Sequence, residues 1–204
     1  MTRTTTPLGR LAGALIAGTL VLAGCADGSS DAAANGQAGS SEPSAGAETS
    51  FNDADVSFAQ GMLPHHEQAI EMAQLADGRA ADPRVLDLAG RIEAAQAPEI
   101  DTLTGWLADW GADDMSAMDH GSGDGMGGMM SEQDMTMLMN ATGAEFDRQF
   151  LQQMIAHHRG AVDMAVTEAA DGQMADAIAM AETVRDSQNA EIAEMQKLLT
   201  ELGG

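Results

Sequence analysis

The sequence contains a pair of adjacent histidines twice, and each pair is preceded by a methionine three residues earlier. Thioether sulfur is a soft ligand that suits Cu(I), and imidazole binds Cu(I), Cu(II) and Zn²⁺. Zinc rarely uses methionine, and iron or manganese normally takes carboxylates beside histidines. The pattern therefore predicts a copper site, with Cu(I) favoured and Cu(II) also compatible. Its predicted ligands are Met62, His65, His66, Met154, His157 and His158.

A helical wheel predicts that both histidine pairs face the protein interior. At about 100° per residue, His65 and His66 fall about 60° and 40° to either side of Met62, on the apolar stripe. The acidic residues that follow the pairs, Glu71 and Asp163, fall about 180° from that stripe and should face water. Their orientation disfavours an iron site built from carboxylates.

Polar residues also interrupt two other apolar stripes. Gln96 and Gln188 lie at the stripe centres, and Glu99 and Glu191 lie one turn later at the stripe edges. Buried amides need hydrogen-bond partners, so these four residues could orient the histidine rings, and the glutamates could bind metal directly. The alternative is that they only specify how the helices pair.

Residues 111–130 form a linker rich in glycine, aspartate and methionine. A flexible loop can wrap a soft ion, but ordering it costs entropy, so a metal bound here should exchange more easily. The alternative is a low-complexity linker that is merely open to oxidation. The donors of this second metal region are Met115, Met118, His120, Met126, Met129 and Met130.

Helical periodicity dominates the chain, and strand signals are nearly absent. Four helical segments are expected near residues 53–77, 83–110, 132–170 and 174–202, with a break in the third near Gly143. Pro64 and Pro98 interrupt the first two segments and should kink them.

Many residues of the first half recur 92 positions later. The repeated set includes Asp55, Phe58, Ala69, Met72 and Ala73, whose partners are Asp147, Phe150, Ala161, Met164 and Ala165. This spacing predicts two duplicated helical hairpins, about 51–110 and 143–202, within one domain over residues 51–204. Because each hairpin must bury its apolar stripe, the expected fold is an all-α four-helix bundle with pseudo-twofold symmetry.

The N-terminal 24 residues have the features of a bacterial lipoprotein signal peptide. Arg3 and Arg10 precede the apolar run 11–22, and the motif 22–25 ends at Cys25, the only cysteine. The run is too short to span a bilayer, so we expect cleavage, lipidation of Cys25 and an extracytoplasmic protein anchored to the membrane. The alternative is an ordinary secretory signal. Residues 25–50 have the composition of a disordered tether.

The chain is strongly acidic, with a formal net charge of −23. Loss of the two signal-peptide arginines lowers Lys+Arg from 9 to 7 against 32 Asp+Glu, which gives −25. Such a protein repels nucleic acid and anionic lipid head groups, so membrane attachment must come from the acyl chains. The same field concentrates cations at the surface.

The segment Phe58-x3-Met62-x2-His65-His66-x2-Ala69-x2-Met72-Ala73 and its copy, Phe150 to Ala165, resemble the family known as domain of unknown function 305. The Gln-x2-Glu-Ile segments at Gln96 and Gln188 also resemble its following helix, so the similarity covers about residues 51–202. The resemblance implies a ferritin-like fold, extracytoplasmic copper binding through Met and His, and a role in copper tolerance.

Together these features favour a lipoprotein that sequesters copper or hands it to a copper-handling protein partner, without catalysis. No Ser-His-Asp set, phosphate loop or paired-carboxylate site is visible in the sequence. Two alternatives stay open. A ferritin-like metal-dependent oxidase would need carboxylates pointing into the bundle beside the histidines. A surface interaction module would use the histidines only as structural residues.

Overall fold

The computed structural model describes residues 50–112 and 127–203 of the chain. These residues form five α-helices and contain no β-strand. The all-α class predicted from periodicity is confirmed. The third predicted segment is two helices, because Gly143, at φ +66°, interrupts it. The helices are α1 (Asp53–Gln74), α2 (Pro83–Asp109), α3 (Glu132–Asn140), α4 (Ala144–Asp171) and α5 (Ala175–Glu201).

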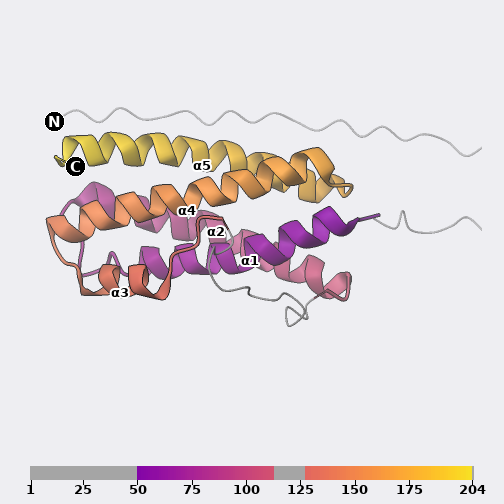
Figure 1. Cartoon of the computed structure of the whole chain (residues 1–204), viewed down its shortest axis with the longest axis horizontal. Coiled ribbons are helices and arrows are strands. Elements are labelled where there is room, and N and C mark those ends of the chain that lie inside the picture. Colours follow the sequence, from indigo (N-terminus) through magenta and orange to yellow (C-terminus); the bar gives the residue numbers. More distant parts are fainter. Residues whose placement is uncertain (1–49, 113–126, 204) are drawn as a thin grey trace, which may run out of the picture. The chain divides into compact units, whose positions relative to one another are not determined.

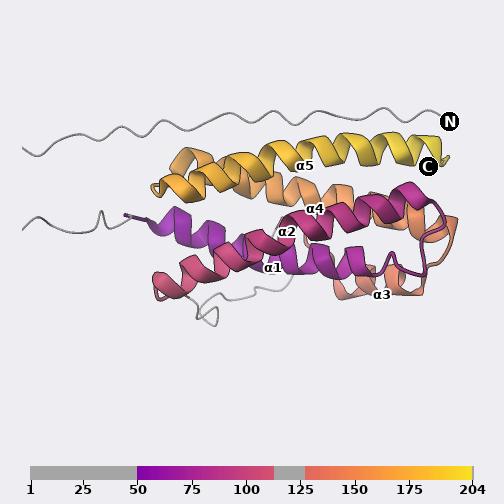
Figure 2. The same ribbon diagram turned by 180° about the vertical axis from the view of Figure 1, so that it is seen from behind.

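The four long helices form two antiparallel hairpins, α1 with α2 and α4 with α5, and α1 packs against α4 to join them (Figures 1 and 2). The short helix α3 packs on α4. Helices α2 and α5 are linked by ion pairs between long side chains, Arg84 with Glu201 and Arg91 with Glu194. These exposed pairs contribute little to stability, so the apolar contacts of α1 and α4 hold the bundle together.

Local sequence signals fix where several helices begin. Asn52 forms a capping box with Asp55 at the start of α1, and Ser131 forms one with Asp134 at the start of α3. Asp82 caps α2 and accepts a hydrogen bond from the Arg84 backbone N–H. Side-chain caps of this kind satisfy N–H groups that the helix itself cannot pair.

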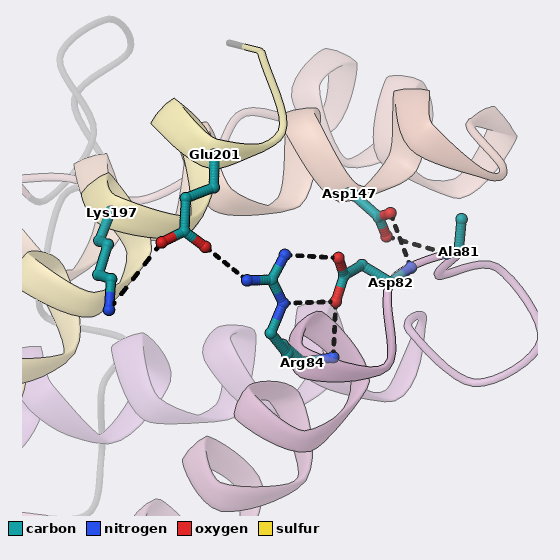
Figure 3. A network of polar contacts seen from close by, with 6 residues as sticks. All are labelled: Ala81, Asp82, Arg84, Asp147, Lys197 and Glu201. Atoms are coloured by element: carbon teal, nitrogen blue, oxygen red, sulfur yellow. Dashed lines mark hydrogen bonds and ion pairs between the residues drawn. The ribbon is translucent and has the colours of Figure 1, made fainter.

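Two buried aspartates tie the hairpins to each other. The Asp55 carboxylate on α1 accepts hydrogen bonds from the backbone N–H groups of Gln173 and Met174, just before α5. Ninety-two residues later, Asp147 on α4 accepts from the N–H groups of Ala81 and Asp82, just before α2 (Figure 3). Each hairpin therefore supplies the anion that satisfies the other hairpin's turn.

Two separate apolar clusters form the core, and a layer of polar side chains lies between them along every long helix. The larger apolar cluster contains Ala69, Met72, Ala73, Ala76, Val85, Leu88, Ala89, Ile92, Met135, Leu138, Ala141, Phe146, Phe150, Leu151, Met154, Ile155, Ile192, Met195 and Leu198. The smaller apolar cluster contains Phe58, Ala59, Met62, Leu103, Leu107, Ala161, Ala165, Ala181 and Val184. The histidine pairs and the two glutamines fall between the clusters on their helices.

The predicted signal peptide, the lipidation site Cys25 and most of the predicted tether lie outside the described residues, as do residues 113–126 of the linker. Within residues 50–112 and 127–203, no helix is long and apolar enough to cross a bilayer. Pro64 and Pro98 lie inside helices that continue past them.

Candidate metal centre

Four buried imidazoles lie at the middle of the bundle, and we call them the histidine layer: His65 and His66 on α1, His157 and His158 on α4. None is more than 1% exposed. The two histidines of each pair are consecutive residues on the apolar face of their helix. Because that face packs against the rest of the bundle, both rings are buried with it. The inward orientation predicted from the helical wheel is correct.

Two glutamates hold the second histidine of each pair. The Nε2 atom of His66 lies 2.7 Å from the Glu99 carboxylate, and Nε2 of His158 lies 2.7 Å from that of Glu191. When Nε2–H donates to a carboxylate, a neutral ring carries its lone pair on Nδ1, and the ring orientation is fixed. Both Nδ1 atoms are buried and have no hydrogen-bond partner among the described residues. The contact thus presents one free nitrogen ligand from each helix.

The first histidines of the two pairs pack directly on each other. The ring centroids of His65 and His157 are 3.7 Å apart, with the rings tilted by 42°. Within residues 50–112 and 127–203, neither nitrogen of either ring has a hydrogen-bond partner. Burial, and then the neighbouring His66, lower the pKa of His65 to about 3. Burial and the surrounding histidines lower the pKa of His157 as well. Both rings are therefore neutral near pH 7, with lone pairs that no proton occupies.

The two predicted methionine ligands flank this layer from opposite sides. Both are fully buried, Met62 in the smaller apolar cluster and Met154 in the larger one. In the described part of the chain, no three His, Cys, Asp or Glu side chains are already arranged to hold a metal ion. Imidazole and thioether donors are thus brought to one region, and side-chain rotation would be needed for several of them to share an ion.

The two buried glutamines do not act as expected. Gln96 and Gln188 are each only 3% exposed, but the Oε1 atom of each has no hydrogen-bond partner in the described ranges. No hydrogen bond joins either side chain to a histidine among residues 50–112 and 127–203. Of the four residues predicted to orient the rings, Glu99 and Glu191 do so instead, because they reach the rings from one turn further along α2 and α5.

Carboxylates beside the histidines are what the oxidase alternative required, so this geometry alone does not remove it. Both glutamates, however, contact the histidine nitrogen that faces away from the free Nδ1 atom, the position of a group that orients a ligand. Glu71 and Asp163 are exposed, as the helical wheel predicted. The iron-type arrangement, with carboxylates projecting into the centre, is not what α1 and α4 provide.

The model of the family described as "Domain of unknown function (DUF305)" matches residues 55–199, which span every long helix and the whole histidine layer. The chain belongs to the DUF305 family. Among curated proteins, none matches this sequence.

Solved structures of DUF305 proteins share the fold. A member from Streptomyces coelicolor is 34% identical, with a TM-score of 0.69 over 74% of this chain and 94% of that one. A fragment from Deinococcus radiodurans is 29% identical, with a TM-score of 0.66 over 74% of this chain and 97% of its own. CopM in its Cu(I)-bound form is 31% identical, with a TM-score of 0.62 over 74% of this chain and 98% of CopM. None of these is described as an enzyme.

In this DUF305 protein the predicted second metal region is only partly described. Met115, Met118, His120 and Met126 lie outside the described residues. Met129 and Met130 are half-buried, and Met130 packs against the larger apolar cluster. The Met130 side chain therefore belongs to the hydrophobic core, which the sequence did not predict.

Sequence reasoning also missed a buried carboxyl pair at the end of the bundle where α1 begins. Glu168 on α4 is 1% exposed and lies beside Asp55. Burial, and then Asp55, raise the pKa of Glu168 to about 8. Burial alone would raise the pKa of Asp55, but hydrogen bonds from the backbone N–H groups of Met174, Asn52 and Gln173 lower it. Ala76 occupies the repeat position of Glu168, so no repeated motif could reveal this residue.

Proposed function

We propose that this DUF305 protein binds copper at the histidine layer and sequesters it or hands it to a copper-handling partner. The observation that carries the proposal is a set of buried imidazole nitrogens that have no hydrogen-bond partner within residues 50–112 and 127–203: both nitrogens of His65 and His157, and Nδ1 of His66 and His158. Leaving buried polar atoms unpaired is costly, and native proteins rarely do so without a reason. A bound ion would pair the nitrogen of a ring that carries the lone pair.

The available donors favour copper over harder ions. The free ligands in the layer are imidazole nitrogens, and the thioethers of Met62 and Met154 are buried one helical turn before the two pairs. This combination suits Cu(I), and the imidazoles also suit Cu(II). Structures of CopM, similar over most of the chain, carry Cu(I), Cu(II) and Ag, which supports metal binding by a bundle of this kind.

We place the protein outside the cytoplasm, attached to the membrane through lipidated Cys25. The signal-like N-terminus and the lipobox at residues 22–25 support this placement. The Streptomyces coelicolor relative is described as a candidate secreted protein, which agrees with it. The tether of residues 25–50 would let the bundle reach a partner at some distance from the bilayer.

The linker would serve as a weaker, faster-exchanging site that takes ions up before the buried layer does. Its donors in this proposal are Met115, Met118, His120, Met126 and Met129, because Met130 packs against the larger apolar cluster. Because ordering a glycine-rich loop costs entropy, its affinity should be lower than that of imidazoles held on two packed helices. The acidic surface would raise the local cation concentration further.

An anaerobic Cu(I) titration of the purified protein against a chromogenic chelator tests this proposal. The tight stoichiometry should fall in the variants His65→Ala/His66→Ala and His157→Ala/His158→Ala. It should stay unchanged in a variant that lacks only residues 115–126, which should lose the weaker binding alone.

The proposal fails if both histidine variants, shown to be folded by circular dichroism, retain the full tight stoichiometry. Equal affinity of the wild-type protein for Cu(I) and for Zn²⁺ would contradict the copper preference. An absence of any metal-dependent rise in melting temperature would favour a structural role for the histidines, because a tight ligand stabilises the folded state.

A further inference from the structure

A short segment before α3, residues 127–130, crosses α1 and α4 beside the histidine layer, and we call it the strap. We propose that Gln68 and Gly160 are positioning residues that seat the strap over the layer, so that the strap limits the access of water and ions to the imidazoles. The effect of the strap on metal-ion exchange rests on the proposed function. The covering of the imidazoles by the strap does not.

One end of the strap is clasped by α1. The Gln68 side chain accepts a hydrogen bond from the Met130 N–H at 2.7 Å and donates one to the Met130 carbonyl at 3.0 Å. The Met130 side chain packs against the larger apolar cluster. A primary amide that both donates to and accepts from one residue fixes that residue's orientation as well as its position. Gln68 thus holds the strap at a defined point on α1.

The other end lies directly on the α4 backbone. A Cβ atom at Gly160 would lie 1.5 Å from the Gly127 carbonyl oxygen, so any side chain there would displace the strap. A Cβ atom at Gly128 would lie 2.8 Å from the Ala156 carbonyl oxygen and 2.9 Å from that of His157. Gly128 also has φ +91°, a conformation that favours glycine. The strap and α4 can approach this closely only because glycine lies on both, at Gly128 and at Gly160.

The two seats are related to the histidine pairs by register. Gln68 is two residues after His66, and Gly160 is two residues after His158, so both occupy the same position of the 92-residue repeat. The strap therefore crosses next to both pairs at once, with Gly128 against the Ala156 and His157 carbonyls and Met130 held by Gln68. Figure 1 shows the segment that precedes α3 passing over α1 and α4 near the middle of the bundle.

The side of the layer formed by α2 and α5 is partly open to solvent. Glu99 and Glu191 reach the second histidines there, with side chains 21% and 16% exposed. Within the described ranges no hydrogen bond joins His65 or His157 to these glutamates, and the two histidines are 0% and 1% exposed. The strap is thus the element that would have to move for a reagent to reach the stacked pair from the side of α1 and α4.

Gly160→Ala is the sharpest test, because it places a methyl group where the strap now lies. Alanine favours a helix more than glycine does, so α4 should keep its helical content. In the metal-free protein, diethylpyrocarbonate, which acylates neutral imidazoles, should modify His65 and His157 faster than in wild type, as mapped by peptide mass spectrometry. The matched control is Gly90→Ala, an exposed helix position where a Cβ atom meets nothing within 4 Å. The control should leave the modification rate unchanged.

Gln68→Ala tests the other seat without adding bulk. It should raise the same modification rate by about tenfold, the order expected from losing two hydrogen bonds that keep the strap closed. Loss of Cu(I) to a chelator should accelerate by a similar factor. Unchanged acylation in folded Gly160→Ala and Gln68→Ala proteins would contradict the proposal that the strap covers the imidazoles. Faster acylation in these variants, together with no Cu(I) binding by the wild-type protein, would support the covering role of the strap and contradict the proposed function.

Discussion

The imidazole of His65 packs on the imidazole of His157, with ring centroids 3.7 Å apart, although 92 residues separate them. The two histidine pairs therefore meet in one cluster across the α1–α4 contact. In the part of the chain that the structure describes, none of the four nitrogens of this stacked pair has a hydrogen-bond partner. An arrangement that costs stability in the metal-free protein is expected where a ligand supplies the missing contacts.

The double variant His65→Leu/His157→Leu should be more stable than wild type in the absence of metal. Each unpaired buried polar group costs about 1–3 kcal/mol, and leucine fills much of the volume without adding one. Urea unfolding of the metal-free proteins measures the difference. The variant should also lose the increase in melting temperature that Cu(I) gives wild type.

The matched control for this substitution is His66→Leu/His158→Leu. It removes the partners of Glu99 and Glu191, so it should not stabilise the protein. Equal unfolding free energies for wild type and His65→Leu/His157→Leu would mean that the unpaired nitrogens of the stacked imidazoles do not destabilise the metal-free protein.

Glu99→Gln and Glu191→Gln should each lower the affinity for Cu(I) by about 10–100-fold, the usual effect of removing a carboxylate that orients a histidine ligand. Chelator competition measures the affinity. The fold should persist, because both side chains are partly exposed and glutamine keeps an acceptor oxygen. Glu71→Gln, on the exposed face of α1, is the control. A variant at Glu99 that binds like this control would show that the contact with His66 does not position a ligand.

Asp147→Ala should destabilise the protein by about 2 kcal/mol, because two backbone N–H groups before α2 would lose a charged acceptor that is itself buried. The measurement is the free energy of unfolding in urea. Asp163→Ala, at an exposed position of the same helix, should change it by less than about 0.5 kcal/mol. Similar losses in both variants would mean that Asp147 does not join the hairpins.

Glu168→Gln should remove a pH dependence of stability. The pKa of Glu168 is raised from 4.5 to about 8, so between these values the folded protein holds a proton that the unfolded chain has released. The free energy of unfolding of wild type therefore falls as pH rises from 4.5 through 8. Glutamine resembles the protonated acid, so the variant should match wild type near pH 5 and exceed it near pH 9.

Urea unfolding at pH 5, 7 and 9 checks this expectation. Glu67→Gln, an exposed position on α1, controls for the general loss of one negative charge. If Glu168→Gln and Glu67→Gln change the pH dependence of the unfolding free energy equally, then the change comes from net charge and not from the buried pair of Glu168 and Asp55.

Local signals in the sequence determined the helices and the inward orientation of the histidines. Apolar periodicity predicted α1, α2, α4 and α5, and Gly143 marked the break before α4 because its backbone conformation ends a helix. Residues on one helix keep a fixed angular relation, so the wheel placed His65 and His66 inward and Glu71 outward without knowledge of the rest of the fold.

Contacts between helices were decided only by the tertiary structure. The wheel gives a direction but neither a distance nor a register, so it could not show that His65 stacks on His157 or that Glu99, rather than Gln96, reaches His66. Gln68 and Gly160 carry no local signal, because their roles depend on the backbone of a segment 30 to 60 residues away. The sequence therefore determined which donors face inward, and the packing of α1 on α4 brought them into one layer with a cover.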